Sequence, residues 1–427
     1  MSIQEREVSE LGPDERVAFF ERDAGVESVR SDVRDIVERV REEGDVAVRE
    51  FTEQFDDVSV GNLEITDQCE RAYDDLDDEL LEAIDTAAAN VREFHEAQLP
   101  EDWRESFDDG RELGRRFRPI DRVGVYVPGG SAAYPSSAIM GIVPAVVAGV
   151  DHVSVVTPPA EQISPVTLAA IHAAGADAVY SVGGAQGIAA LAYGTESVTR
   201  VQKIVGPGNR WVTAAKAEVR GDVAIDFLAG PSEVVVIADD TAEPQFVASE
   251  LIAQAEHDAN ASVVAITDDE TTAEAITEAL ERQADERERE ETIRSALSND
   301  ASGVLLARSM SEAILFTEEY APEHLSIIAD DDEELLKRID SAGSVFLGPH
   351  TPVAAGDYAS GTNHVLPTNG GARVTGGLSV ETFVRSTTVQ RLSETGLENL
   401  EKTITTLATA EGLEGHAESV RMRFDHE

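Results

Sequence analysis

The sequence predicts an α/β protein made of two Rossmann-like parallel-sheet units, with helical segments at the N-terminus and C-terminus. Short runs of β-branched residues alternate with Ala-rich helical stretches from about residue 120 onward, and such alternation builds parallel sheets with helices on their faces. These runs fall into two successive series. The 427 residues also exceed the roughly 250 to 300 at which a single core stops growing, so more than one compact unit is expected.

The first hundred residues are expected to be helical. Phe51 and Phe55 lie four residues apart on one helix face, and Gly44 marks the end of the helix before them. In that earlier helix apolar residues recur at helical spacing, namely Val29, Val33, Ile36 and Val40.

The two series of strands follow in order. The first comprises residues 123–127, 152–156, 178–182 and 203–205, with helices expected at 138–148 and 165–174. The second comprises residues 233–238, 262–267, 303–307, 325–328 and 344–347, with a helix at 245–258. Residues 227–232 form the joint between them. After Val380 the chain is expected to turn helical again and to break at Gly412, and so small a segment needs another surface to dock on.

The charge balance restricts the possible partners. The chain has 83 Asp and Glu against 34 Lys and Arg, a formal charge of −49, while 42% hydrophobic residues and 32 Gly fit a globular protein. Nucleic acid and anionic membranes require clustered cations, so both are excluded as partners. We interpret the acidity as adaptation to a cytoplasm of high salt, because screening makes the self-repulsion tolerable. The alternative is one very acidic partner-binding face.

Cysteine usage and the N-terminus favour a cytoplasmic location. Cys69 is the single cysteine, so neither an intrachain disulfide nor a Cys-based zinc site is expected. The segment after Met1 is polar and acidic, unlike a signal peptide. No apolar run approaches the ~18 residues that would cross a membrane.

Gly-rich turns follow three strands of the first series, although neither GxGxxG nor GxxxxGK[ST] occurs. They span residues 126–131, 183–186 and 206–209, each between a strand and a helix. Three such turns at one sheet edge would define a ligand crevice whose amides meet a phosphate. Each turn taken singly is also explained as a plain tight turn.

Several His and acidic residues form candidate metal and substrate contacts. Gln254 and His257 are three residues apart on one helix, as two ligands of one ion require. Asp357 and His364 share a Gly-flexible loop. Glu411 and His416 flank the break at Gly412, giving a carboxylate for a substrate amine and an imidazole for a metal. The alternatives are a packed helical His, an Asx-type turn and ordinary surface polarity.

Glu323 and His324 place two proton-transfer groups side by side before an apolar strand. His titrates near neutral pH unperturbed, whereas Glu needs burial or a partner to do so. The alternative is a capping Glu beside a surface His. Neither GxSxG nor HExxH occurs, so common hydrolase signatures are missing.

Taken together, these segments resemble the histidinol dehydrogenase family, the NAD-dependent zinc enzymes of histidine synthesis. The resemblance covers most of the chain from about residue 120 onward, and no motif position departs from it. It rests on VGVYVPGG from Val123, VGGAQGIAALAYGT from Val182, GPGN from Gly206, AGPSEVVVIAD from Ala229, AQAEHD from Ala253, YAPEHL from Tyr320, GDYASGTNHVLPT from Gly356 and AEGLEGH from Ala410.

The resemblance implies oxidation of L-histidinol to L-histidine through histidinal, in two hydride transfers that use two NAD. His324 would take the alcohol proton, and Glu323 would activate the water that adds to histidinal. One zinc ion per subunit would mainly orient the substrate. Its ligands would be Gln254, His257, Asp357 and His416, which with His324 also line the substrate site. Further substrate contacts would be Ser232, His364 and Glu411, and NAD contacts would be Tyr126, Gln186 and Asn209.

The resemblance also implies a homodimer with shared active sites, in which the terminal segment crosses to the neighbouring subunit. The domains would be an N-terminal helical segment at 1–21, a first α/β domain of 22–125 with 234–377, a second α/β domain at 126–233 and a C-terminal tail at 378–427.

Three other functions stay open from the sequence. A related zinc and NAD dehydrogenase could oxidise another small alcohol. A zinc hydrolase could use Glu323 and His324 on a metal-bound water, but it leaves Tyr126, Gln186 and Asn209 unexplained. A catalytically silent metal-binding protein would be expected to lose some of these residues, and none is lost.

Overall fold

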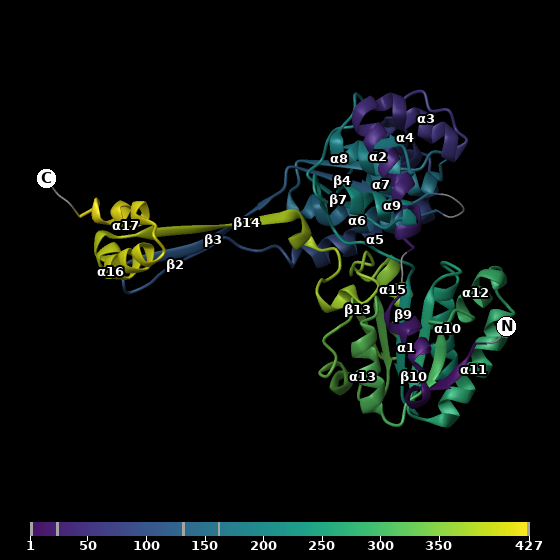
Figure 1. Ribbon diagram of the computed structural model, residues 1–427. Helices are drawn as coiled ribbons and strands as arrows, with labels where there is room; N and C mark the ends of the chain where they lie inside the picture. Colours follow the sequence, from purple (N-terminus) through teal and green to yellow (C-terminus); the bar gives the residue numbers. More distant parts are fainter. Residues whose placement is uncertain (1–2, 23–24, 130–132, 161–162, 425–427) are drawn as a thin grey trace. The chain divides into compact units, whose positions relative to one another are not determined.

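The computed structural model describes residues 3–22, 25–129, 133–160 and 163–424 (Figure 1). By its internal contacts the chain divides into two units. The first combines Met1–Gln98 with Asp121–Phe383, and the second combines Leu99–Ile120 with Val384–Glu427. The predicted α/β class, with two parallel sheets and helical termini, is confirmed.

A five-stranded parallel sheet contains the first series of strands. Its order is β6-β5-β4-β7-β8, so the chain starts in the middle, winds one way and then the other, as in doubly wound folds. Val125 of β4 pairs with Val155 on one side and Val205 on the other. The strands are β4 (Arg122–Tyr126), β5 (His152–Thr157), β6 (Ala178–Ser181), β7 (Lys203–Val205) and β8 (Ala224–Ile225). The crossover helices are α6 (Pro135–Ala148), α7 (Pro165–Ala174), α8 (Gly184–Tyr193) and α9 (Arg210–Val219).

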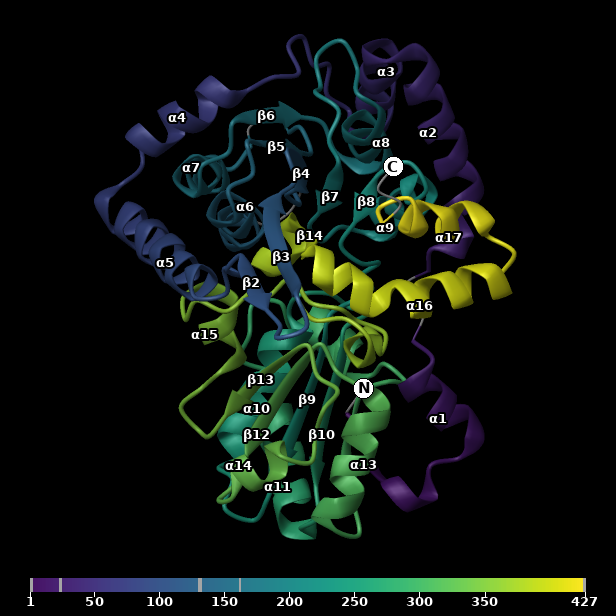
Figure 2. The same ribbon diagram turned by 90° about the vertical axis from the view of Figure 1, so that its left-hand side faces the viewer.

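A six-stranded parallel sheet contains the second series and has the same winding. Its order is β1-β11-β10-β9-β12-β13 (Figure 2). Buried Val and Ile fill β9 and β10 because helices cover both faces. The strands are β1 (Glu5–Glu7), β9 (Glu233–Ala238), β10 (Ser262–Thr267), β11 (Gly303–Leu306), β12 (His324–Ile328) and β13 (Ser344–Leu347). The helices are α10 (Pro244–Ala255), α11 (Glu270–Ala284), α12 (Glu290–Leu297), α13 (Met310–Tyr320), α14 (Asp332–Leu336) and α15 (Val353–Tyr358).

The expected N-terminal helices form; α2 to α5 pack around the five-stranded sheet, whereas α1 packs in the core of the six-stranded sheet. The apolar face of α2, including Val33 and Val40, joins one core with Ile188 of α8 and Val212 of α9. Gly44, with φ +57°, separates α2 from α3. Cys69 is buried on α4. The helices are α1 (Pro13–Phe20), α2 (Arg30–Glu43), α3 (Asp45–Asp56), α4 (Thr66–Asp74) and α5 (Asp78–Glu96), and the short 3-10 turns are η1 (Val8–Glu10), η2 (Glu27–Val29), η3 (Gly371–Arg373) and η4 (Val380–Phe383).

Two strand regions differ from the expected helices. After the 3-10 turn η4, the segment does not become α-helical at once, because β14 (Val384–Leu392) pairs with β3 (Arg111–Pro119) over nine residue pairs. The strand β1 adds to β11 although Glu5, Arg6 and Glu7 carry no apolar alternation. Both strands lack the buried face that gives a strand its sequence pattern.

The second unit is a three-stranded antiparallel sheet with two helices. Its order is β14-β3-β2, and β2 is Trp103–Ser106. Gly114 of β3 is required because a Cβ there would meet the carbonyl oxygen of Trp103 at 2.2 Å. The helices are α16 (Glu394–Ala410) and α17 (Glu414–Arg421).

The predicted domain boundaries stay a prediction. Residue 125, one predicted boundary, lies inside β4, and α2 and α3 share their core with the five-stranded sheet. Among the described residues no helix is both long and apolar enough to cross a membrane.

Candidate active site

Glu323 and His324 lie at the amino edge of the six-stranded sheet. Tyr320 ends α13, Ala321 takes φ +50°, and the chain then enters β12 at His324. The backbone of Glu233, the first residue of the neighbouring strand β9, holds both side chains. Its N–H donates to Glu323 Oε2 at 2.8 Å, and its carbonyl oxygen lies 3.2 Å from His324 Nδ1. The pair is therefore fixed by strand pairing.

Burial and neighbouring charges shift the proton affinities of this pair. Burial raises the pKa of Glu323 to about 8. Burial alone would lower the pKa of His324, but the carboxylates of Glu323 and Asp357 outweigh it and raise that pKa. The raised pKa brings Glu323 nearer to neutral pH, as general acid-base chemistry requires, and the two carboxylates stabilise a protonated His324. The alternative of a surface His is excluded, because His324 is 4% exposed.

His324 has one ring nitrogen directed away from the β9 backbone. Nδ1 donates to the Glu233 carbonyl oxygen, which leaves Nε2 as the acceptor atom in the neutral ring. Nε2 is buried and makes no hydrogen bond among the described residues, although Asp357 Oδ1 lies 3.5 Å away. A buried acceptor with no donor is an atom that a ligand can satisfy.

Asp357 and His364 lie next to the pair. His364 Nδ1 donates to the carbonyl oxygen of Asp357 at 2.9 Å and lies 3.9 Å from its carboxylate Oδ1. Burial opposes ionisation of Asp357, but His324, His364 and His257 together hold the pKa of its carboxyl below the usual value. His257 is therefore near enough to act on Asp357, as the sequence predicts for two contacts of one ion.

Gln254 and His257 come from the C-terminal end of α10. Gln254 is buried, one turn before the exposed His257. Glu250, one turn earlier still, accepts a hydrogen bond from the backbone N–H of Val353 at 2.8 Å, the first residue of α15. This bond ties the helix that carries Gln254 to the helix that carries Asp357.

Glu233 and Arg22, which the sequence analysis missed, support this edge. Glu233 forms a buried ion pair with Arg22, whose Nε lies 2.7 Å from Glu233 Oε1. The same oxygen accepts from the N–H of Asn369 at 2.9 Å. Glu250 could have been found from its position four residues before Gln254, which places both on one helix face. No local sequence pattern indicates a role for Arg22.

Tyr126, Gln186 and Asn209 lie at the carboxyl edge of the five-stranded sheet, one on each Gly-rich turn. Tyr126 ends β4, and its hydroxyl accepts from the N–H of Gly184 at 3.1 Å. Gln186 is buried in the first turn of α8. Asn209 is the N-cap of α9, where its Oδ1 accepts from the N–H groups of residues 211 and 212.

Gly206, in the turn before Asn209, lies close against the backbone of Tyr126. Gly206 has φ +108°, and a Cβ there would meet the carbonyl oxygen of Tyr126 at 2.3 Å. Asp226 Oδ2 accepts from its N–H at 2.9 Å, and Lys216 Nζ donates to its carbonyl oxygen at 3.1 Å. Lys216 and Asp226 also form a buried ion pair with each other. No sequence motif predicted these contacts around Gly206.

A helix of the five-stranded sheet touches the His364 loop. His364 Nε2 lies 3.5 Å from Ser137 Oγ in the first turn of α6, and Asn363 Nδ2 donates to the carbonyl oxygen of Met140 at 2.8 Å. The His364 loop therefore contacts the helix that follows the Tyr126 turn.

The remaining predicted residues lie outside this cluster or contribute backbone only. Ser232 precedes β9, and its carbonyl oxygen accepts from Ser262 at 3.0 Å. Glu411 ends α16 and His416 lies on α17, both exposed in the second unit. The first unit thus brings Glu323, His324, Asp357, His364 and His257 together by itself.

No set of three or more His, Cys, Asp or Glu is arranged as a metal site within the described ranges. The predicted zinc ligands contribute one amide, two imidazoles and one carboxylate, and one of them belongs to the second unit.

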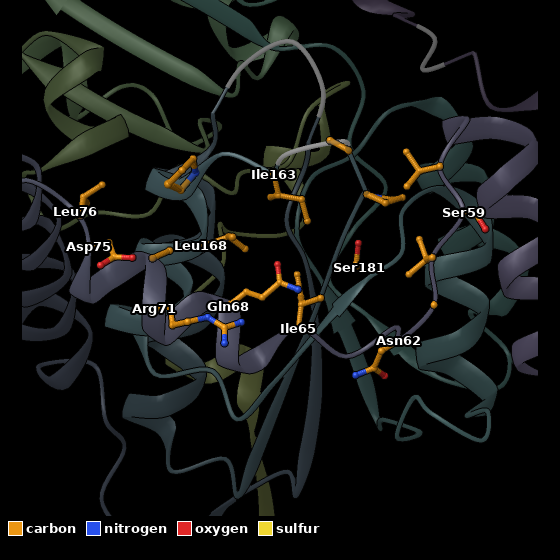
Figure 3. Close-up of a pocket in the computed structure, with 17 residues that line it drawn as sticks. Ser59, Asn62, Ile65, Gln68, Arg71, Asp75, Leu76, Ile163, Leu168 and Ser181 are labelled. Atoms are coloured by element: carbon orange, nitrogen blue, oxygen red, sulfur yellow. The ribbon is translucent and has the colours of Figure 1, made fainter.

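A cavity of about 650 Å³ lies elsewhere, beside the ends of β5 and β6 (Figure 3). Gln68 and Arg71 of α4 line it together with Ser181 and the loop that includes Ser59 and Asn62. None of its lining residues belongs to the predicted site.

Two doubly wound sheets, one edged by Gly-rich turns and the other by a buried carboxylate-imidazole pair, define an α/β enzyme equipped for proton transfer. Residues 21–424 match the family model for histidinol dehydrogenase. The histidinol dehydrogenase of Haloarcula marismortui is 73% identical over 420 residues, which cover 98% of this chain and 99% of the relative. That of Halobacterium salinarum is 71% identical with the same coverage.

Similarity extends to a solved structure. The crystal structure of histidinol dehydrogenase from Elizabethkingia anophelis matches with a TM-score of 0.93 and 36% identity, covering 99% of this chain and 98% of that one. The chain therefore belongs to the histidinol dehydrogenase family and is an oxidoreductase of this type, with a place in histidine biosynthesis. The resemblance predicted from the motifs is confirmed, and the halophilic archaeal relatives fit the interpretation of the acidity.

Proposed function

We propose that this protein oxidises L-histidinol to L-histidine through histidinal, using two NAD per turnover and one zinc ion per subunit. The observation that supports this most directly is the buried pair Glu323 and His324, fixed on the backbone of Glu233 beside Asp357. Alcohol oxidation requires a base for the hydroxyl proton, and aldehyde oxidation requires one for water.

His324 is the base for the alcohol in this proposal. Its Nε2 is the buried acceptor without a hydrogen-bond donor, so it would take the alcohol proton, and NAD, when bound, would supply the hydride acceptor. Asp357, 3.5 Å away, stabilises the imidazolium that forms. Glu323 then takes a proton from the water that adds to histidinal, and burial gives it the raised pKa that such a base needs.

Gln254, His257, Asp357 and His416 are the proposed zinc ligands. Imidazole nitrogen and carboxylate or amide oxygen suit zinc, and the negative end of the α10 dipole, where Gln254 and His257 lie, favours a cation. The zinc, when bound, orients the amino and imidazole nitrogens of the substrate. Ser232, His364 and Glu411 complete the substrate contacts.

Tyr126, Gln186 and Asn209 are the proposed NAD contacts. Gln186 and Asn209 lie at the N-termini of α8 and α9, where backbone amides offset the anionic pyrophosphate in a chain of formal charge −49, and Tyr126 lies at the end of β4. The crevice at the carboxyl ends of β4 and β7, where the winding reverses, is where doubly wound sheets bind such ligands.

The proposal includes a cytoplasmic homodimer with shared sites. Large apolar side chains of the second unit are exposed, among them Leu407 at 59% and Met422 at 66%, and a partner subunit would cover them. Glu411 and His416 would then complete the partner's site. No nucleic acid or membrane is expected to bind.

The test is NADH formation from L-histidinol in concentrated KCl, with the NADH counted against the histidinol consumed. Two NADH per histidinol, lost with a chelator and restored by zinc, is the expected result. A folded dimer that forms no NADH would refute histidinol as the substrate and shift the assignment to another small alcohol.

A further inference from the structure

The described residues just after the second strand give the proposed NAD site no carboxylate for a ribose. Doubly wound dinucleotide sites bind a ribose with a carboxylate beyond the second strand. The second strand here is β5, which ends at Thr157, and residues 158–160 after it carry no carboxylate. A carboxylate from another segment can take this role.

Asp56 is such a carboxylate. It is half-buried at the last position of α3, and its Oδ2 lies 3.5 Å from Nε2 of Gln186. Its charge also acts on Tyr126. Asp56 therefore adjoins two of the three proposed NAD contacts, although it is distant from both in sequence.

The charge of Asp56 is poorly compensated within the described part of the chain. Its carboxylate accepts a long hydrogen bond from Gln186 at 3.5 Å, no Lys, Arg or His of the described residues forms an ion pair with it, and burial raises the pKa of its carboxyl to about 6. The C-terminal end of α3 also disfavours an anion. A carboxylate that weakens the fold and faces Gln186 is better explained by a ligand that donates hydrogen bonds to it.

The helix arrangement decides which half of NAD reaches Asp56. α6 packs with α5 and α7 on one face of the five-stranded sheet, whereas α8 packs with α2, α3 and α9 on the other (Figure 2). Ser137 of α6 contacts His364, so the substrate and the nicotinamide belong to the α6 face. The adenosine half then lies on the face of α8, where Asp56 is.

We infer that Asp56 accepts hydrogen bonds from the adenosine ribose of NAD and thereby selects NAD over NADP. The 2′-hydroxyl donates a hydrogen bond to a carboxylate. A 2′-phosphate in its place would be repelled by the like charge of Asp56, and neither group would have a proton to donate to the other. This inference rests on the proposed NAD dependence and names the residue that makes the dinucleotide site specific.

The test measures NAD and NADP binding by calorimetry in concentrated KCl for the full chain and for Asp56→Asn and Asp56→Ser. Both variants are expected to bind NAD about tenfold more weakly or worse, as loss of a charge-assisted hydrogen bond predicts. NADP binding should stay unchanged or improve, so the NAD to NADP ratio falls at least about tenfold. The matched control is Asp57→Asn, which removes the same charge from the exposed neighbouring residue and tolerates φ +56°.

The structural alternative gives a different pattern. A merely structural Asp56 would lower the unfolding temperature and weaken both dinucleotides equally, which would overturn the inference, as would unchanged NAD binding. We expect the unfolding temperature of Asp56→Asn to stay equal or rise. A wild-type chain that binds NAD but does not oxidise histidinol would refute the proposed substrate alone, and a wild-type chain that binds no NAD would refute both.

Discussion

The two sheets have the same winding order, yet their predicted site residues lie at opposite edges. In the five-stranded sheet they lie at the carboxyl edge, where α8 and α9 begin near Gln186 and Asn209. In the six-stranded sheet they lie at the amino edge, where α10 and α13 end near Gln254 and Glu323. Topology alone therefore does not locate a site in this fold.

The choice of edge sets the sign of the ligand that each site favours. Helix N-termini present unpaired amides and a partial positive charge, which suits a pyrophosphate. Helix C-termini present carbonyl groups and a partial negative charge, which suits a metal ion and a substrate amine. On the proposed function, one architecture therefore supplies both an anion site and most of a cation site. The predictions below test whether each can be impaired without the other.

The largest effect is expected at the amino edge from His324→Ala. Turnover should fall by about 10² to 10⁴-fold because the base for the alcohol proton is gone. NAD binding and a zinc content near one per subunit should persist. Steady-state kinetics, metal analysis and NAD titration would check this, and an unchanged rate would remove His324 from the mechanism.

His257→Ala tests the cation site itself. The affinity for zinc should fall by more than roughly 10- to 100-fold, which is the cost of losing a residue that only hydrogen-bonds to a metal ligand. Activity should fall with it. NAD binding should be kept. The matched control is the His350→Ala variant, which replaces an exposed loop histidine and should retain zinc.

His416→Ala extends this test to the second unit. We expect zinc content and activity to fall together, as for His257→Ala. A variant that keeps both would refute the assignment of His416 as the fourth ligand.

Lys216→Met should damage the carboxyl edge instead. It leaves Asp226 buried without its cation, which costs about 3 to 5 kcal/mol of folding free energy. The Gly206 turn should loosen, so the KM for NAD rises while zinc content stays unchanged. Denaturant unfolding in KCl would measure the loss, and Lys337→Met, which breaks an exposed pair with Glu334, should cost less than about 1 kcal/mol.

The smallest effect concerns the pH dependence of stability at Asp56. Its folded pKa, about 6, is raised above the unfolded value, so its contribution is most favourable at low pH and is lost as pH rises from about 4 to about 6. Asp56→Asn should therefore gain stability over the wild type across that window, by about 1 kcal/mol after allowing for solvent screening. Unfolding curves at several pH values would check this, and a constant difference would contradict it.

Burial decided how much the sequence could predict. Strands such as β9 and β10 are buried on both faces, so their Val and Ile runs marked them plainly. β14 and β3 have mostly exposed or half-buried residues and left no apolar pattern. The motifs identified Glu323 and His324, and the structure then showed what holds them.

Residues that support the site from a distance were not predictable. Arg22 reaches Glu233 across 211 positions and Asp56 reaches Gln186 across 130, so no local spacing relates them. Glu250 had a visible helical spacing to Gln254, but its bond to Val353 depends on how α10 and α15 pack.

The rate at which the buried Cys69 reacts with a thiol reagent would report local opening of this chain. Its thiol is 1% exposed on α4, and burial raises its pKa to about 12, so a thiol reagent cannot reach a reactive thiolate in the closed protein. Each labelling event must follow a fluctuation that uncovers α4. Because no other cysteine competes, the labelling rate in different salt concentrations would report how strongly salt holds that helix in place.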